Sequence, residues 1–103
     1  MKNGGRIINV SSGMGQLEDM ESGSIAYRLS KTALNALSKV MSNELSSKNI
    51  KVNAICPGWV QTDMGGSSAN LTVKESTDRI IKFALEDNFP NGKFLQHGEV
   101  IPW

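Results

Sequence analysis

The chain has 103 residues, a length that allows one domain with a thin hydrophobic core. Its 11 Lys and Arg residues and 10 Asp and Glu residues give a formal net charge of +1, and they are scattered along the sequence, which argues against a nucleic-acid partner. One cysteine and one histidine provide neither an internal disulfide nor an ordinary metal site, and no stretch reaches the ~20 apolar residues of a membrane span, so we expect a metal-free protein in the reducing cytoplasm.

The first predicted element is a buried strand over residues 6–10. This β-branched run ends in the hydroxyls of Ser11 and Ser12. Gly13 and Gly15 follow, but neither a Lys-Ser/Thr pair nor an immediate helix comes after them. The glycines therefore predict a turn rather than a phosphate-binding loop.

Residues 25–47 have the periodicity of an amphipathic helix, with Ser24 as the expected N-cap. The pattern predicts that the apolar arc packs on the core and the polar arc faces solvent. The apolar arc consists of Ala26, Leu29, Ala33, Ala36, Leu37, Val40, Met41 and Leu45, and the polar arc of Arg28, Thr32, Asn35, Lys39, Ser42, Asn43 and Ser46.

Tyr27 and Lys31 lie at the border of the apolar arc, four residues apart and so on one helical face, about 40° apart in azimuth. An ammonium close to a phenol favours the ionised phenol, so Tyr27 is a candidate proton donor or acceptor. The hydroxyl of Ser12, at the end of the preceding strand, is a candidate to orient a substrate oxygen. The spacing alone also fits an ordinary solvated pair.

Residues 50–56 predict a second strand. A strand, a long helix and another strand form a βαβ unit with parallel strands, normally right-handed. The carboxyl ends of both strands then share one end of the sheet, where ligands bind in open α/β folds. Ser12 and Pro57 would meet there, whereas Cys56 is expected to serve in packing.

The remaining sequence predicts a small polar segment over residues 65–70, which acts either as a lid over the ligand or as a plain connector. Thr72 and Glu75 form a capping box for a second helix of about 15 residues. Residues 93–96 indicate a third strand. His97 follows this strand with no partner evident in the sequence, so we expect a structural or solvated role for it.

Three motifs, in this order and spacing, resemble the second half of a short-chain dehydrogenase/reductase, and the resemblance covers nearly the whole chain. It implies an α/β fold: the carboxyl-terminal half of a Rossmann-type doubly wound parallel sheet, with about three strands and two main helices in a single partial domain over residues 1–103. The last crossover in this family can be left-handed. The motifs are Asn9-Val10-Ser11-Ser12, Tyr27-x-x-x-Lys31, and Val52-Asn53-Ala54-Ile55-Cys56-Pro57-Gly58 followed by Thr62.

The resemblance implies an NAD(P)-dependent oxidoreductase, close to carbonyl reductases, that acts on a small carbonyl or alcohol. Ser12 would bind the substrate oxygen, Tyr27 would pass a proton to or from it, and Lys31 would favour the phenolate. Tyr27 and Lys31 would also contact the cofactor, which is NADPH or NADH, with NADPH favoured. The other residues implied to contact the nicotinamide are Pro57, Gly58, Val60 and Thr62.

The Gly-rich dinucleotide fingerprint of this family does not occur in the sequence. Residues 1–5 resemble the join between the two halves, so we expect a fragment that is inactive alone, produced by a truncated gene, a start assigned at an internal methionine, or excision. Such a chain would pair with the missing amino-terminal half or with itself.

The sequence raises two other hypotheses about function. A non-catalytic α/β module would associate with another chain through the strand over residues 6–10, because that strand becomes an exposed edge without the other half. A serine hydrolase using Ser12 fails, because His97 is the only histidine and no Gly-x-Ser-x-Gly motif is present.

Overall fold

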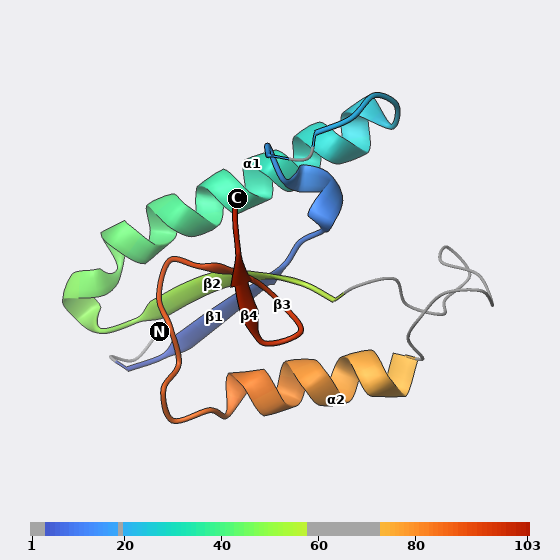
Figure 1. Ribbon diagram of the computed structural model, residues 1–103. Coiled ribbons are helices and arrows are strands. Elements are labelled where there is room, and N and C mark those ends of the chain that lie inside the picture. Colours follow the sequence, from blue (N-terminus) through green and yellow to red (C-terminus); the bar gives the residue numbers. More distant parts are fainter. Residues whose placement is uncertain (1–3, 19, 58–72) are drawn as a thin grey trace.

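The computed structural model describes residues 4–18, 20–57 and 73–103. Within them, one sheet of four strands has the order β1-β2-β3-β4, with the first three strands parallel and β4 antiparallel to β3 (Figure 1). This confirms the α/β class, the parallel pairing and the position of β1 as an edge strand, but the sequence did not indicate the fourth strand. The strands are β1 (Arg6–Val10), β2 (Lys51–Cys56), β3 (Phe94–Gln96) and β4 (Glu99–Ile101).

Two helices lie on opposite faces of the sheet (Figure 1). Helix α1 (Ile25–Glu44) connects β1 to β2, and helix α2 (Val73–Ala84) precedes β3. Because the chain crosses the sheet in one direction, from β1 to β2 to β3, helices on opposite faces give the two connections opposite hands. One connection therefore departs from the right-handed rule. Neither described helix is long and apolar enough to cross a membrane.

A cluster of hydrophobic core residues lies between α2 and the sheet. Phe83 of α2 packs with Ile55 and Leu95 of the central strands, and the Phe83 and Phe89 ring centroids are 4.8 Å apart. Ile8 and Ile80 cover this cluster as partly buried neighbours. The core is thin, as expected for a chain of this length.

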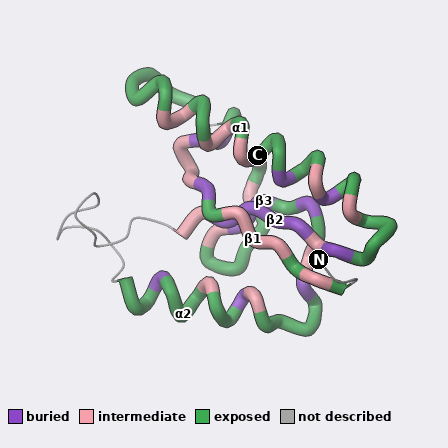
Figure 2. The backbone as a smooth tube through the Cα atoms, turned by 180° about the vertical axis from the view of Figure 1, so that it is seen from behind, coloured by how far each residue is buried: buried purple, intermediate pink, exposed green. Residues whose placement is uncertain are grey.

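Helix α1 packs on the sheet with the face opposite to the predicted one, so that expectation is wrong. Its buried residues are Asn35, Ser38 and Ser42. The large apolar side chains of Leu37 and Val40 are 51% and 55% exposed. Figure 2 shows this inverted arrangement, with exposed residues along the outer side of α1 and buried residues along β2.

The size of the side chains on the sheet explains the inversion. Asn9, Ala54 and Phe94 are register partners on adjacent strands and therefore project from the same face. Asn9 Nδ2 donates a hydrogen bond to Ser38 Oγ at 2.9 Å, which identifies this face as the one under α1. Small residues on α1 let the helix lie close to the wholly buried Phe94.

Helix α1 is shorter than predicted. It ends at Glu44, and a 3₁₀ turn over Ser46–Lys48 continues to Asn49, whose φ of 56° stops the helical path. Ser24 occupies the N-cap position as expected, but its side chain makes no capping hydrogen bond.

Candidate active site

The carboxyl ends of β1 and β2 are joined directly. The Ser11 N–H donates to the Ile55 carbonyl at 2.7 Å, and the Gly13 N–H donates to Cys56 Sγ at 3.2 Å. The segment that follows β1, here called the serine turn (residues 11–16), is thereby fixed on the end of β2. Cys56 is a hydrogen-bond acceptor for this turn, a role that the sequence did not indicate.

Ser12 is the N-cap of a 3₁₀ helix, η1 (Gly13–Gly15), within the serine turn. Its hydroxyl oxygen accepts a hydrogen bond from the Met14 N–H at 3.1 Å. A hydroxyl group has one proton to donate and two acceptor lone pairs. The contact with Met14 uses an acceptor position and leaves the proton available for a substrate oxygen.

The serine turn packs on α1 at Lys31 and Thr32. Thr32 Oγ1 donates to the Gly15 carbonyl at 2.8 Å, and Ser11 Oγ donates to the Lys31 carbonyl at 3.4 Å. A Cβ atom at Gly15 would lie only 2.7 Å from the Lys31 carbonyl carbon. Glycine is therefore required at this position, because backbone meets backbone there.

Tyr27 and Lys31 occupy the first two turns of α1, and both are half-buried. The Lys31 ammonium lies 5.6 Å from the centroid of the Tyr27 ring. It also donates to the Val10 carbonyl at 3.5 Å, at the end of β1. The cation thus lies between the phenol ring and the strand that leads into the serine turn.

The carboxyl-terminal residues support the serine turn from its other side. Gln16 Nε2 donates to the Pro102 carbonyl at 2.6 Å, and the Leu17 N–H donates to the Trp103 carbonyl at 2.7 Å. The Trp103 ring stacks on Phe94 with centroids 5.6 Å apart. No sequence motif marked this support, which depends on β4 returning the chain toward α1.

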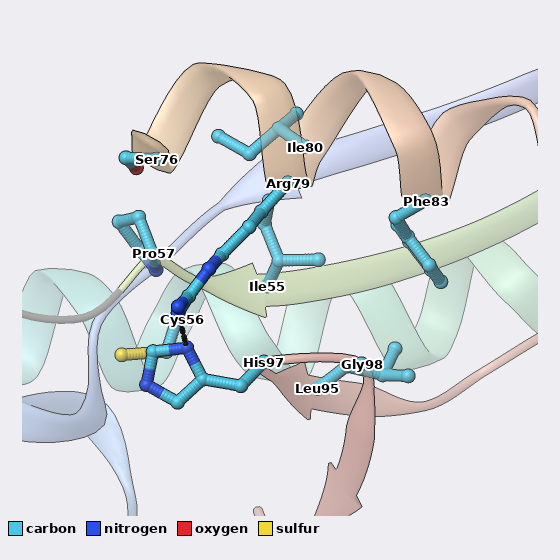
Figure 3. Close-up of a pocket in the computed structure, with 10 residues that line it drawn as sticks. All are labelled: Ile55, Cys56, Pro57, Ser76, Arg79, Ile80, Phe83, Leu95, His97 and Gly98. Atoms are coloured by element: carbon cyan, nitrogen blue, oxygen red, sulfur yellow. Dashed lines mark hydrogen bonds between the residues drawn. The ribbon is translucent and has the colours of Figure 1, made fainter. Parts of the chain in front are cut away.

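Pro57 lines a small hollow at the carboxyl end of β2, together with residues of α2 and the β3–β4 turn (Figure 3). Arg79 and His97 lie side by side there and contact each other through an Arg79 Nη1 to His97 Nδ1 hydrogen bond. His97 therefore has a partner that the sequence did not indicate, and its side chain is exposed to solvent. The other residues implied to contact the nicotinamide, Gly58, Val60 and Thr62, and the expected lid lie outside the described residues.

Comparisons with known proteins agree with the fold. The family model described as short chain dehydrogenase matches residues 1–72. The chain is similar to "C-signal" of Myxococcus xanthus, with 36% identity over 102 residues that cover 95% of this chain and 61% of C-signal.

Two solved structures share the architecture. Carbonyl reductase Sniffer of D. melanogaster has a TM-score of 0.87 and 42% identity, covering 95% of this chain and 41% of that one. A carbonyl reductase from chicken fatty liver with bound NADPH has a TM-score of 0.83 and 36% identity, covering 95% of this chain and 42% of that one. This chain thus spans between about two fifths and three fifths of these proteins.

Proposed function

This chain belongs to the short-chain dehydrogenase family, and from that membership we propose that it is the catalytic part of an NAD(P)-dependent oxidoreductase that interconverts carbonyl compounds and alcohols. The observation that carries the proposal is the Lys31 ammonium 5.6 Å from the Tyr27 ring, beside the strand that leads to Ser12. NADPH is the favoured cofactor, because the similar chicken carbonyl reductase binds it. We expect a cytoplasmic location, where the thiol of Cys56 stays reduced.

The nicotinamide, when bound, supplies or accepts the hydride. The chain's own residues handle the substrate oxygen. In the direction of reduction, Ser12 donates a hydrogen bond to the carbonyl oxygen and Tyr27 transfers its phenolic proton to that oxygen as negative charge develops. Lys31 stabilises the phenolate that remains. The transferred proton leaves with the alcohol product, and a proton from solvent water restores the Tyr27 phenol before the next turnover.

The described residues fit a nicotinamide nucleotide in part. The contact with Val10 uses one of the three N–H donors of Lys31, so the ammonium can also hold ribose hydroxyls. We propose that Pro57, Gly58, Val60 and Thr62 contact the nicotinamide ring and its carboxamide. A segment outside this sequence would supply the Gly-rich turn for the phosphates, because the sequence contains no such motif.

Titration of NADPH and NADH into the purified chain, followed by tryptophan fluorescence, tests the dependence on that segment. We expect binding far weaker than that of a complete enzyme of the family. Binding as tight as in a complete enzyme would overturn the proposal that a second half is required.

The catalytic roles are tested in this chain joined to an amino-terminal half that carries a Gly-rich turn. Tyr27→Phe removes only the phenolic oxygen and should lower carbonyl reduction by about 10²- to 10⁴-fold, the contribution typical of general acid catalysis. NADPH affinity, measured in the same preparation, should change little. Retained turnover in Tyr27→Phe would dismiss Tyr27 as the acid.

A second function, a non-catalytic module that associates with another chain, is favoured by one observation. Within the described residues β1 is an edge strand with unpaired backbone groups on its outer side, and Val10 is exposed on it. Such an edge favours pairing with a further strand. A cooperative, monomeric unfolding transition at low micromolar concentration would contradict this function.

A further inference from the structure

Two nitrogen-bearing side chains lie at the same end of the sheet as the serine turn. Arg79, in the second turn of α2, extends across the end of β2 to the ring of His97, which directly follows β3 (Figure 3). Because β1, β2 and β3 are parallel, the carboxyl ends of all three strands face the same side. His97 is therefore placed where ligands of open α/β sheets bind.

The chemistry of this pair is that of hydrogen-bond donors. A guanidinium group has N–H donors and no acceptor, so in the contact between them Arg79 donates and His97 Nδ1 accepts. An imidazole that accepts at Nδ1 carries its proton on Nε2. Both side chains are exposed, so the remaining N–H groups of Arg79 and the Nε2–H of His97 are available to a ligand.

A hollow of about 40 Å³ lies beside the pair, with Ile55, Phe83 and Leu95 among its apolar lining residues. Its volume suits one small group of two or three atoms rather than a whole ligand. Cys56 also lines the hollow, and its sulfur accepts the hydrogen bond from the Gly13 N–H of the serine turn. A ligand anchored by one end in the hollow can therefore extend toward Ser12.

The turn between β3 and β4 places His97 in the left-handed region of the backbone. His97 and Gly98 connect β3 to β4 with φ values of 53° and 80°. A two-residue turn with positive φ at both positions favours Asn, Asp or Gly at the first. Histidine, like Asn and Asp, is enriched among the non-glycine residues found in the left-handed region. The turn is therefore compatible with histidine, and it places the imidazole at the carboxyl end of β3.

We propose that Arg79, oriented by its hydrogen bond to His97, binds the carboxylate of the substrate, so that the preferred substrates are carbonyl compounds that also carry a carboxylate, or the corresponding hydroxy acids. The assignment of the ligand as substrate rests on the proposed oxidoreductase function. Arg79 would form two parallel N–H···O bonds with the carboxylate. His97 would act as a positioning residue, because its Nδ1 accepts from Arg79 Nη1 and so fixes the orientation of the guanidinium group. Asp78, the neighbour of Arg79 in sequence, forms an ion pair with Lys74 at 2.9 Å, so its carboxylate is bound to a different cation.

A phosphate group of the cofactor has related chemistry, so the test separates the two sources. His97 is the only histidine, and its ring resonances can therefore be followed by NMR without ambiguity during titrations of the purified chain. The probes are 4-carboxybenzaldehyde, its neutral methyl ester and inorganic phosphate. We expect a saturable shift with 4-carboxybenzaldehyde and none with the ester. A shift with phosphate alone, or equal shifts with acid and ester, would overturn the carboxylate site.

Three substitutions complete the test. Arg79→Gln should weaken 4-carboxybenzaldehyde binding at least about tenfold, as expected for losing charge-assisted hydrogen bonds. His97→Asn should also weaken it while keeping the turn, because asparagine suits the left-handed backbone; here the backbone N–H signals of β3 and β4 replace the imidazole as the probe. Lys48→Gln removes an exposed positive charge from the 3₁₀ turn that precedes the amino end of β2, at the opposite end of the sheet from the pair, and should leave the affinity unchanged. Equal affinities in all three variants would refute the site.

Tyr27→Phe separates this proposal from the oxidoreductase function. The substitution removes the proposed proton donor and one hydrogen bond to the aldehyde oxygen but keeps the carboxylate contact, so it should weaken 4-carboxybenzaldehyde binding much less than Arg79→Gln does. If redox activity is never found but Arg79→Gln still abolishes binding, the anion site stands and the substrate assignment falls. If the wild-type chain shows no saturable binding, the anion site itself is wrong.

Discussion

A Cβ atom on Gly15 would lie 2.7 Å from the carbonyl carbon of Lys31, closer than side-chain carbons approach backbone atoms. The backbone of the serine turn at Gly15 therefore lies directly against the backbone of α1 at Lys31 and Thr32. Ser12 and Lys31 belong to these two segments and are both proposed catalytic residues. The absence of a side chain at Gly15 therefore sets how closely their segments approach each other.

Gly15→Ala should destabilise the chain by about 2 kcal/mol, because the added methyl group meets backbone that cannot move aside without shifting the whole helix turn. Urea unfolding followed by circular dichroism measures the loss. Gly13→Ala is the matched control from the same turn, since its Cβ would meet only Cys56 Sγ at 3.8 Å, an ordinary contact. Equal losses in both variants would show that the close approach at Gly15 has no special cost.

Asn35→Leu should raise the free energy of unfolding by about 1–3 kcal/mol. Asn35 is 3% exposed, and within the described residues neither atom of its amide has a hydrogen-bond partner, so an apolar side chain of similar size avoids the desolvation penalty. The matched control is Asn43→Leu on the exposed side of the same helix, which should change stability by less than about 0.5 kcal/mol. A loss of stability in Asn35→Leu would mean that a bound water satisfies the amide.

The fold could be predicted largely because its strands and helices carry strong local patterns. The β-branched runs predicted β1 and β2. The motif that contains Tyr27 and Lys31 was expected at the start of the helix between these strands, and both residues lie in the first two turns of α1. The face of α1 that packs on the sheet could not be predicted, because periodicity shows which residues share a face and not which layer covers it. Strand β4 was missed because His97-Gly98 is an uncommon hairpin turn and the strand has three residues.

The sequence predicted only those parts of the candidate site that belong to continuous sequence motifs. The convergence of the serine turn with the end of β2 follows from parallel pairing, which the sequence indicates. The contact of Arg79 with His97 joins residues 18 positions apart through α2 and the β3–β4 turn. No spacing rule connects two side chains across separate elements, so three-dimensional packing was needed to find this pair.

The apolar face of α1 should make the chain self-associate. Ile25, Leu29 and Leu37 are 72%, 62% and 51% exposed on one helix, a larger apolar surface than scattered single residues present. The double substitution Leu29→Gln with Leu37→Gln should shift sedimentation velocity profiles toward monomer without loss of unfolding free energy. Ile81→Gln, at a comparably exposed apolar position on α2, is the control and should leave association unchanged.

Arg6→Gln should lower the free energy of unfolding by about 1–2 kcal/mol, because Arg6 joins β1 to the end of α2. Its Nη1 donates to the carbonyls of Ala84 and Glu86 at 2.8 and 2.7 Å, and its guanidinium carbon lies 4.5 Å from the Phe89 ring centroid. The Ala84 carbonyl lies in the last turn of the helix and the Glu86 carbonyl just beyond it. Backbone acceptors at a helix carboxyl end lack intrahelical partners and attract positive charge.

Arg6→Lys distinguishes hydrogen-bond geometry from charge at this position. Lysine keeps the positive charge, but it lacks the planar guanidinium group that stacks on an aromatic ring while donating to two carbonyls. We therefore expect Arg6→Lys to recover less than half of the stability lost in Arg6→Gln, measured by urea unfolding. Full recovery would show that charge alone holds β1 against α2, and the same stability difference should then shrink in high salt.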